Sequence, residues 1–118
     1  MFRFLALLIV PALVALPVAA QDKGYSVLVA KAKTKIARDL KDPDSAKFRD
    51  LGIYKSSTGK GGVSVCGEIN AKNGYGAYIG FRKFLVSDEM AIIDGADGGL
   101  SYDGLGPALC HTKIADAK

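Results

Sequence analysis

The hydrophobic periodicity of this chain changes once, near Phe48, and that change limits the fold more than any other feature. Upstream, apolar residues recur at three- and four-residue steps, which predicts an amphipathic helix over about residues 24–41. Downstream, apolar and polar residues alternate, which is typical of strands with two different faces. A helix followed by strands predicts an α+β fold in which the helix packs on an antiparallel sheet, one layer of each.

The predicted helix has an apolar arc and a basic face on opposite sides. Its apolar arc consists of Tyr25, Leu28, Val29, Ala32, Ile36 and Leu40. Its basic face consists of Lys31, Lys35, Arg38 and Lys41. A charged helix face is usually just solvated, and the alternative is weak contact with an anionic surface of the cell envelope.

Four segments carry the strand pattern, and we expect them to form a four-stranded antiparallel meander. They span residues 48–56, 62–70, 75–86 and 90–94. We expect a glycine-rich loop after the first strand, and a tight turn after the second in which Asn73 and Gly74 adopt positive φ. On the second strand, the face that we expect to be buried carries Val63, Val65, Gly67 and Ile69.

Residues 1–20 have the pattern of a signal peptide. Arg3 precedes an uncharged apolar run, and Pro17 is followed by small residues that end at Ala20. The run is short compared with the roughly 20 apolar residues that a bilayer needs, and a proline interrupts it. We therefore expect cleavage after Ala20 and a periplasmic or secreted protein without a transmembrane segment. The mature chain, residues 21–118, fits a single α+β domain.

Cys66 and Cys110 are the two cysteines of the chain. In a small exported chain an even cysteine count predicts one disulfide, which would attach the C-terminal segment to the sheet. The chain-entropy model assigns such a bridge roughly 4 kcal/mol of stability. The alternative is a reactive thiol at Cys110 beside His111. This is a weak alternative, because adjacent residues rarely place a base against the neighbouring sulfur and there is no Cys-x-x-Cys motif.

The third predicted strand combines glycines with aromatic residues. Gly76 and Gly80 flank Tyr78 on one face, which leaves open backbone on both sides of the ring. Glycine inside a strand is costly unless it permits a bulge or a close approach. We expect the ring to pack over the two glycines beneath the C-terminal segment held by Cys110. The alternative is an exposed aromatic platform for a partner.

A longer pattern carries a resemblance to a known family. "DPDSAKF" at residues 42–48 is followed by "CGEINAKNGYGAYIGFRKF" at residues 66–84. The pattern consists of Asp42, Pro43, Ser45, Ala46, Phe48, Cys66, Gly67, Asn70, Asn73, Gly76, Tyr78, Gly80 and Phe84. It resembles a family of small exported proteins of proteobacteria and their prophages. The resemblance implies an exported bacterial domain and no particular activity.

We expect no catalytic site, metal site or cofactor. His111 is the single histidine, so a histidine-rich zinc site is excluded and a hydrolytic triad would depend on this one residue. Asp94, Asp97 and Asp103 lie in a glycine-rich segment without EF-hand spacing, so we expect a flexible acidic loop rather than a calcium site. The formal net charge of +4 is small for a nucleic-acid-binding protein, and we expect no nucleic-acid partner.

Two functions of different class remain. The first is a non-enzymatic binding module of the bacterial envelope, inhibitor- or immunity-like, that acts on a protein partner. Its candidate surface consists of Glu68, Asn70, Asn73, Tyr75, Gly76, Tyr78 and Gly80. For the asparagines, a turn that satisfies its own backbone is the more ordinary explanation. The second function is association with anionic envelope surfaces through the basic helix face. An enzyme is the least expected outcome.

Overall fold

The computed structural model describes residues 18–95 and 101–117, with side chains from residue 24 onward. Residues 1–17 of the predicted signal peptide and Asp97 of the acidic segment lie outside the described residues. The elements in chain order are helix α1 (Val18–Ala37), 3-10 helix η1 (Pro43–Ser45), strands β1 (Lys47–Lys55), β2 (Val63–Asn70), β3 (Arg82–Val86) and β4 (Ala91–Ile93), helix α2 (Tyr102–Leu109) and strand β5 (Thr112–Asp116).

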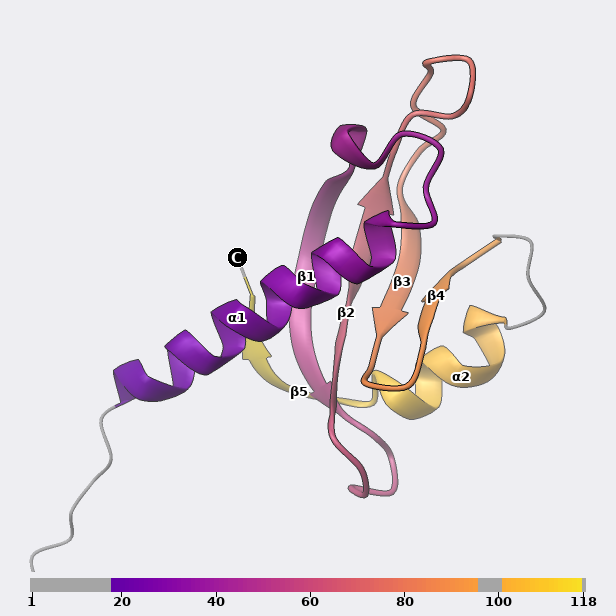
Figure 1. Ribbon diagram of the computed structural model, residues 1–118. Coiled ribbons are helices and arrows are strands. Elements are labelled where there is room, and N and C mark those ends of the chain that lie inside the picture. The colour runs from indigo at the N-terminus through magenta and orange to yellow at the C-terminus, as the bar shows by residue number, and fades with distance from the viewer. Residues whose placement is uncertain (1–17, 96–100, 118) are drawn as a thin grey trace, which may run out of the picture.

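The described strands form one antiparallel sheet in the order β4-β3-β2-β1-β5 (Figure 1). The meander expected for the first four strands is confirmed, because each pairs with its neighbour in the chain. The expectation of four strands is wrong, since β5 pairs with β1 at one edge, and α2 is an additional helix. Predicted boundaries also differ. The first helix spans Val18–Ala37 rather than about residues 24–41, and the third strand begins at Arg82 rather than Tyr75.

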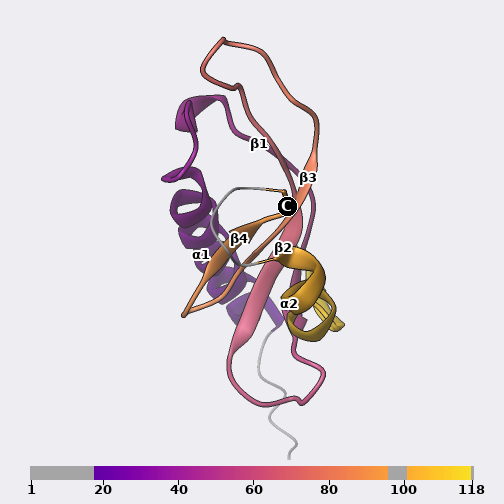
Figure 2. The ribbon, with the colours of Figure 1, turned by 90° about the vertical axis from the view of Figure 1, so that its right-hand side faces the viewer.

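One face of the sheet packs against α1, and Figure 2 shows α1 and α2 on opposite sides of the sheet. The buried residues of this first core are Val29, Ala32, Ile36, Leu51, Ile53, Val65, Ile69, Phe84, Val86 and Ile93. The helix contributes Val29, Ala32 and Ile36, whose spacing of three and four residues places them on one stripe. Of the four β2 residues expected to be buried, Val65 and Ile69 are buried, whereas Val63 and Gly67 are half-buried.

The other face packs against α2, so the expected single helical layer is corrected to one helix on each face. The buried residues of this second core are Cys66, Leu85 and Ile92. Leu105 and Leu109 of α2 pack against them. The predicted disulfide between Cys66 and Cys110 is present, with the two Cα atoms 6.2 Å apart. It joins β2 to the residue that follows α2.

A bulge in β1 lies over the middle of β2. The register of the two strands shifts between Arg49 and Gly52, and Asp50 has a positive φ of 53°, which is uncommon for residues other than glycine. A Cβ atom on Gly67 would lie 3.0 Å from the carbonyl oxygen of Arg49 and 3.1 Å from that of Asp50. It would also lie 2.7 Å from Cδ2 of Leu51. Only glycine at position 67 therefore leaves room for the bulged backbone.

Candidate functional site

Residues 71–81, between β2 and β3, form a loop that extends beyond the sheet at the top of Figure 1; we call it the aromatic loop. Tyr75 is 97% exposed there, Ile79 52% and Tyr78 39%. Among the described residues, the one other large hydrophobic side chain with comparable exposure is Val27 on α1. Three of the four exposed large hydrophobic side chains among the described residues therefore lie in this loop.

Two asparagine side chains shape the backbone of the aromatic loop. Oδ1 of Asn73 accepts hydrogen bonds from the backbone N–H groups of Tyr75 (2.9 Å) and Ala77 (3.2 Å). The N–H of Asn73 donates to the carbonyl oxygen of Ala77 at 2.9 Å. Oδ1 of Asn70 accepts a hydrogen bond from the N–H of Gly80 at 3.0 Å. Both amide oxygens therefore serve the loop's own backbone.

Two glycines of the loop are needed for their positive φ angles rather than for close packing. Gly76 has φ of 78° and Gly80 has φ of 100°, and no atom beyond the adjoining residues lies within 4 Å of a Cβ built at either position. The interpretation that the Tyr78 ring packs over these glycines is therefore wrong. The positive φ expected at Asn73 and Gly74 is also wrong, because the loop places it at Gly76 and Gly80 instead.

Tyr78 connects the loop to the segment before β1. Its hydroxyl donates a hydrogen bond to the carbonyl oxygen of Ser45 at 3.0 Å. Oγ of Ser45 accepts a hydrogen bond from the N–H of Lys72 at 2.8 Å and donates one to the carbonyl oxygen of Asp42 at 2.7 Å. η1 therefore holds Tyr78 and the loop. We expected the C-terminal segment to cover the Tyr78 ring, but the residue contacts η1 instead.

Two ammonium groups lie over the Tyr78 ring. Nζ of Lys47 is 4.5 Å from the ring centroid, and Nζ of Lys72 is 5.6 Å from it. A cation over the face of an exposed aromatic ring contributes about 0.5–1 kcal/mol. The Lys47 contact joins the loop to β1, whereas the Lys72 contact lies within the loop.

Glu68, the remaining residue of the predicted surface, lies on the sheet rather than in the loop. Its carboxylate pairs with Nε of Arg49, and the guanidinium carbon of Arg49 lies 3.8 Å from the centroid of the Phe81 ring. The other predicted residues come together in the loop or at its start: Asn70, Asn73, Tyr75, Gly76, Tyr78 and Gly80. The alternation of apolar and polar residues could not predict that Ser45 and Lys47 belong to this site. Each contacts Tyr78, which lies more than 30 positions later in the chain.

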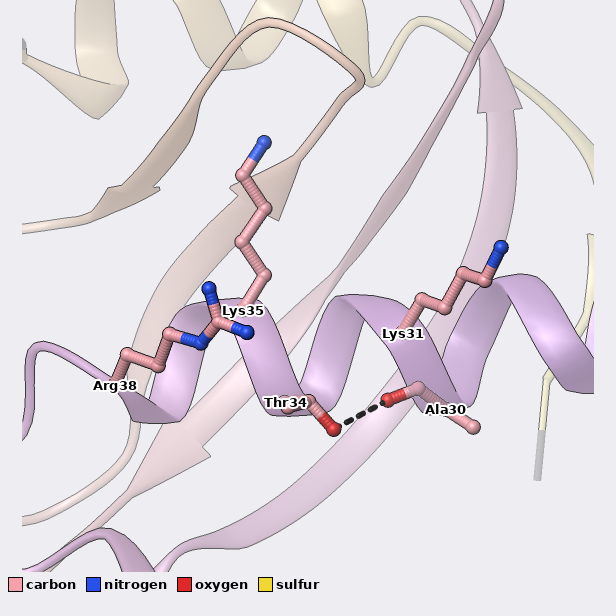
Figure 3. Close-up of a pocket in the computed structure, with 5 residues that line it drawn as sticks. All are labelled: Ala30, Lys31, Thr34, Lys35 and Arg38. Carbon is pink, nitrogen blue, oxygen red and sulfur yellow. Dashed lines mark hydrogen bonds between the residues drawn. The ribbon is translucent and has the colours of Figure 1, made fainter.

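The basic face of α1 forms a second exposed feature. A shallow hollow there is lined by Ala30, Lys31, Thr34, Lys35 and Arg38 (Figure 3). Figure 3 shows the side chains of Lys31 and Lys35 leaving α1 on the same side. Nζ of Lys35 donates hydrogen bonds to the carbonyl oxygens of Ser87 (3.0 Å) and Asp88 (3.3 Å). Lys41 lies beyond the end of α1 and is not part of this hollow.

The face that packs against α2 has a hollow of about 240 Å³ beside the disulfide. It is lined by Asp50, Tyr54, Cys66, Gly67, Glu68, Lys83, Tyr102 and Cys110. Burial raises the pKa of Tyr102, and Tyr54 and Asp94 raise this pKa further. Because Cys110 is bonded to Cys66, a reactive thiol beside His111 is excluded in this state.

Within residues 18–95 and 101–117, no group of three or more His, Cys, Asp or Glu side chains is placed to hold a metal ion. No helix in this part of the chain offers an apolar stretch long enough to span a bilayer.

No protein-family model, curated protein or solved structure matches this chain.

Proposed function

We propose that this protein is a small exported, non-enzymatic binding module that holds a protein partner through its aromatic loop, as inhibitor and immunity proteins do. The observation that carries the proposal is the ring of Tyr75, 97% exposed on a loop whose backbone Asn73 holds. Tyrosine is enriched among the residues that dominate binding energy at protein interfaces. A ring in this position is available to fill a pocket of a partner.

The fixed backbone of the loop also supports the proposal. Hydrogen bonds to Asn70, to Asn73 and from Tyr78 hold the loop in one shape before any partner arrives. A loop that is ordered in advance loses less conformational entropy on binding than a mobile one. Ile79 adds a second exposed apolar side chain to the same loop. A concave partner surface fits a protruding loop of this kind best.

The exported setting belongs to the same proposal. The Cys66–Cys110 disulfide supports it, because such bonds persist in oxidising compartments. The signal-peptide pattern of residues 1–20 points to the same compartment. The partner is therefore sought in the periplasm or outside the cell.

A capture experiment tests the proposal. The tagged protein is incubated with a periplasmic extract at low and high salt, beside Tyr75→Ala and a control, Val27→Ala, which removes exposed apolar surface on α1. We expect a protein that the parent and the control retain at high salt and that Tyr75→Ala loses. Loss of about 2 kcal/mol of binding free energy corresponds to a residue that dominates an interface. Equal retention by Tyr75→Ala, or no retained protein at all, would contradict the proposal.

A second candidate function is association with anionic envelope material through α1. The observation that favours it is that Lys31, Lys35 and Arg38 line one hollow (Figure 3). It ranks second because Nζ of Lys35 already donates to two backbone carbonyl oxygens. Binding that disappears at high salt and is lost in Lys31→Gln favours this candidate, because exposed charges are screened over about a Debye length.

A further inference from the structure

A groove between α1 and the sheet adjoins the hollow shown in Figure 3 and shares two lysines with it. It has a volume of about 190 Å³ and is lined by Leu28, Lys31, Ala32, Lys35, Val63, Val65, Val86, Ser87 and Asp88. We propose that this groove binds the alkyl chain of a single-chain anionic amphiphile, such as a fatty acid, whose carboxylate is held by Lys31 and Lys35. This inference does not depend on the aromatic loop.

The apolar lining argues for an alkyl chain. Leu28 and Val63 are only half-buried, and they line the groove together with the buried side chains of Val65 and Val86. A chain placed along these residues would remove their remaining apolar surface from water. Each buried methylene group is worth about 0.8 kcal/mol. The gain therefore grows with chain length until the groove is filled.

The charges at the rim argue for an anionic head group. Lys31 and Lys35 lie one helical turn apart on α1, and both line the groove. Nζ of Lys35 already donates to the carbonyl oxygens of Ser87 and Asp88, which leaves one of its three N–H donors for a carboxylate beside Lys31. The ion pairs found among the described residues involve Arg49 and Lys113, and neither of these two lysines. Asp88 is the one acid in the lining, and its Oδ2 lies 3.4 Å from a Cβ built on Gly62, toward the β1–β2 connection. Lys35 contacts the carbonyl oxygen of Asp88 rather than its carboxylate.

The size of the groove limits the ligand to part of one chain. Pockets that enclose a drug-sized molecule measure about 300–1,000 Å³, which is more than the 190 Å³ available here. A two-chain phospholipid would therefore leave most of its apolar part outside. A single alkyl chain fits with its first methylene groups in the groove and its far end in solvent.

A chain-length series tests this proposal on the unmodified protein. Butanoate, hexanoate, octanoate, decanoate and dodecanoate, each below its micelle concentration, are titrated into the isotope-labelled protein while amide chemical shifts are recorded. We expect shifts around Leu28, Val63 and Val86. We expect affinity to rise about three- to fourfold per methylene group and then to stop rising once the groove is full. A rise that continues over the whole series, or no saturable binding, overturns the proposal.

Two substitutions and a control locate the site. Lys31→Gln should weaken binding of the longest saturating carboxylate by about threefold, as expected for an exposed charge pair. Val63→Phe should fill the groove and weaken binding at least about tenfold, which corresponds to two methylene groups kept out. Lys47→Gln makes the same charge change beside the aromatic loop and should have no effect. Equal effects of Lys47→Gln and Lys31→Gln would overturn the placement.

Neutral and membrane-forming probes separate the remaining outcomes. Dodecyl maltoside carries a similar chain without a negative charge, so we expect it to bind more weakly than dodecanoate. Tight binding of the maltoside would overturn the role assigned to Lys31 and Lys35. Binding to phosphatidylglycerol vesicles without binding to any monomeric carboxylate would also overturn the proposal, and would favour association of the basic helix face with membranes.

Discussion

The hydroxyl of Tyr78 donates a hydrogen bond to the carbonyl oxygen of Ser45, 3.0 Å away and 33 positions earlier in the chain. This bond joins the aromatic loop to η1, and Lys47 and Lys72 place their ammonium groups over the same ring. Tyr78 is therefore an anchor of the loop, whereas the side chain of Tyr75 is almost fully exposed.

Replacing Tyr78 tests the anchor. Tyr78→Phe should lower the free energy of unfolding by about 1 kcal/mol, because it removes one hydrogen bond. Tyr78→Ala should lower it by roughly 2 kcal/mol, because two cation–aromatic contacts are lost as well. A buried core aromatic residue would cost about 3–5 kcal/mol, and the 39% exposure of Tyr78 argues against that value. Urea melts of both variants and the parent measure the difference, and an Ala variant as stable as the parent would contradict the anchor role.

Asn73 should control the order of the loop. Asn73→Ala removes the acceptor for the N–H groups of Tyr75 and Ala77. Both groups are exposed, so we expect a stability loss of only about 1 kcal/mol but faster amide hydrogen exchange at these two positions. Asn73→Asp, which keeps an acceptor oxygen at the same place, is the matched control and should preserve slow exchange. Unchanged exchange in Asn73→Ala would show that the loop is held by other contacts.

Gly67 should be intolerant of any side chain. In Gly67→Ala the new Cβ meets two carbonyl oxygens of the bulge and a methyl group of Leu51, at 2.7–3.1 Å. Because backbone cannot yield as a flexible side chain can, we expect a loss of about 1–3 kcal/mol, typical of overpacking. Gly74→Ala is the control, because nothing lies within 4 Å of a Cβ at that position. Equal melting temperatures for the two variants would contradict this account of the bulge.

The disulfide should supply a large part of the net stability. The Cys66→Ala/Cys110→Ala double variant should lose about 2–5 kcal/mol, as small exported domains do when a native bridge is removed. Reduction of the parent with dithiothreitol should lower the urea midpoint in the same direction. A parent protein whose midpoint is the same with and without reductant would show that the second core is stable without the bridge.

The raised pKa of Tyr102 leads us to expect a loss of stability at alkaline pH. Burial, with Tyr54 and Asp94, raises the pKa of Tyr102 in the folded protein above the ordinary 10.0. The folded state thus holds the phenol proton more tightly than the unfolded state. The contribution of Tyr102 to stability is fully present below pH 10.0 and is lost as the pH rises through the raised folded pKa. Urea midpoints measured across this range without thiols should fall, and Tyr102→Phe should flatten the dependence. The same slope in Tyr102→Phe would assign it to another group.

Periodicity predicts the elements that have a strong local pattern. The helix, the pairing of the first four strands and the buried Val65 and Ile69 all follow from apolar spacing. The helix α2 does not, because Gly104, Gly106 and Pro107 are unfavourable inside a helix. It forms because Leu109 and its neighbours cover the second core beside the disulfide. Its existence therefore depends on tertiary contacts that no local pattern contains.

The aromatic loop shows where strand alternation misleads. Residues 75–81 alternate like a strand, but positive φ at Gly76 and Gly80 breaks the ladder, and Asn70 and Asn73 bond the backbone instead. The presence of two asparagines and two glycines in a short stretch is the signal that favours a loop. The strand β5, by contrast, is a strand that the sequence pattern does not reveal, because its five residues are too few to show a clear period.

The pairing of β1 with β5 also affects how the molecule is made. Of the described strands, β1 is the first to leave the ribosome, and β5, which covers its outer edge, is the last. Until Thr112–Asp116 arrive, the nascent chain carries an open strand edge of the kind that pairs with other chains. Synthesis therefore includes an interval in which the partly made protein is prone to aggregation, and a delay in making β5 would lengthen this interval.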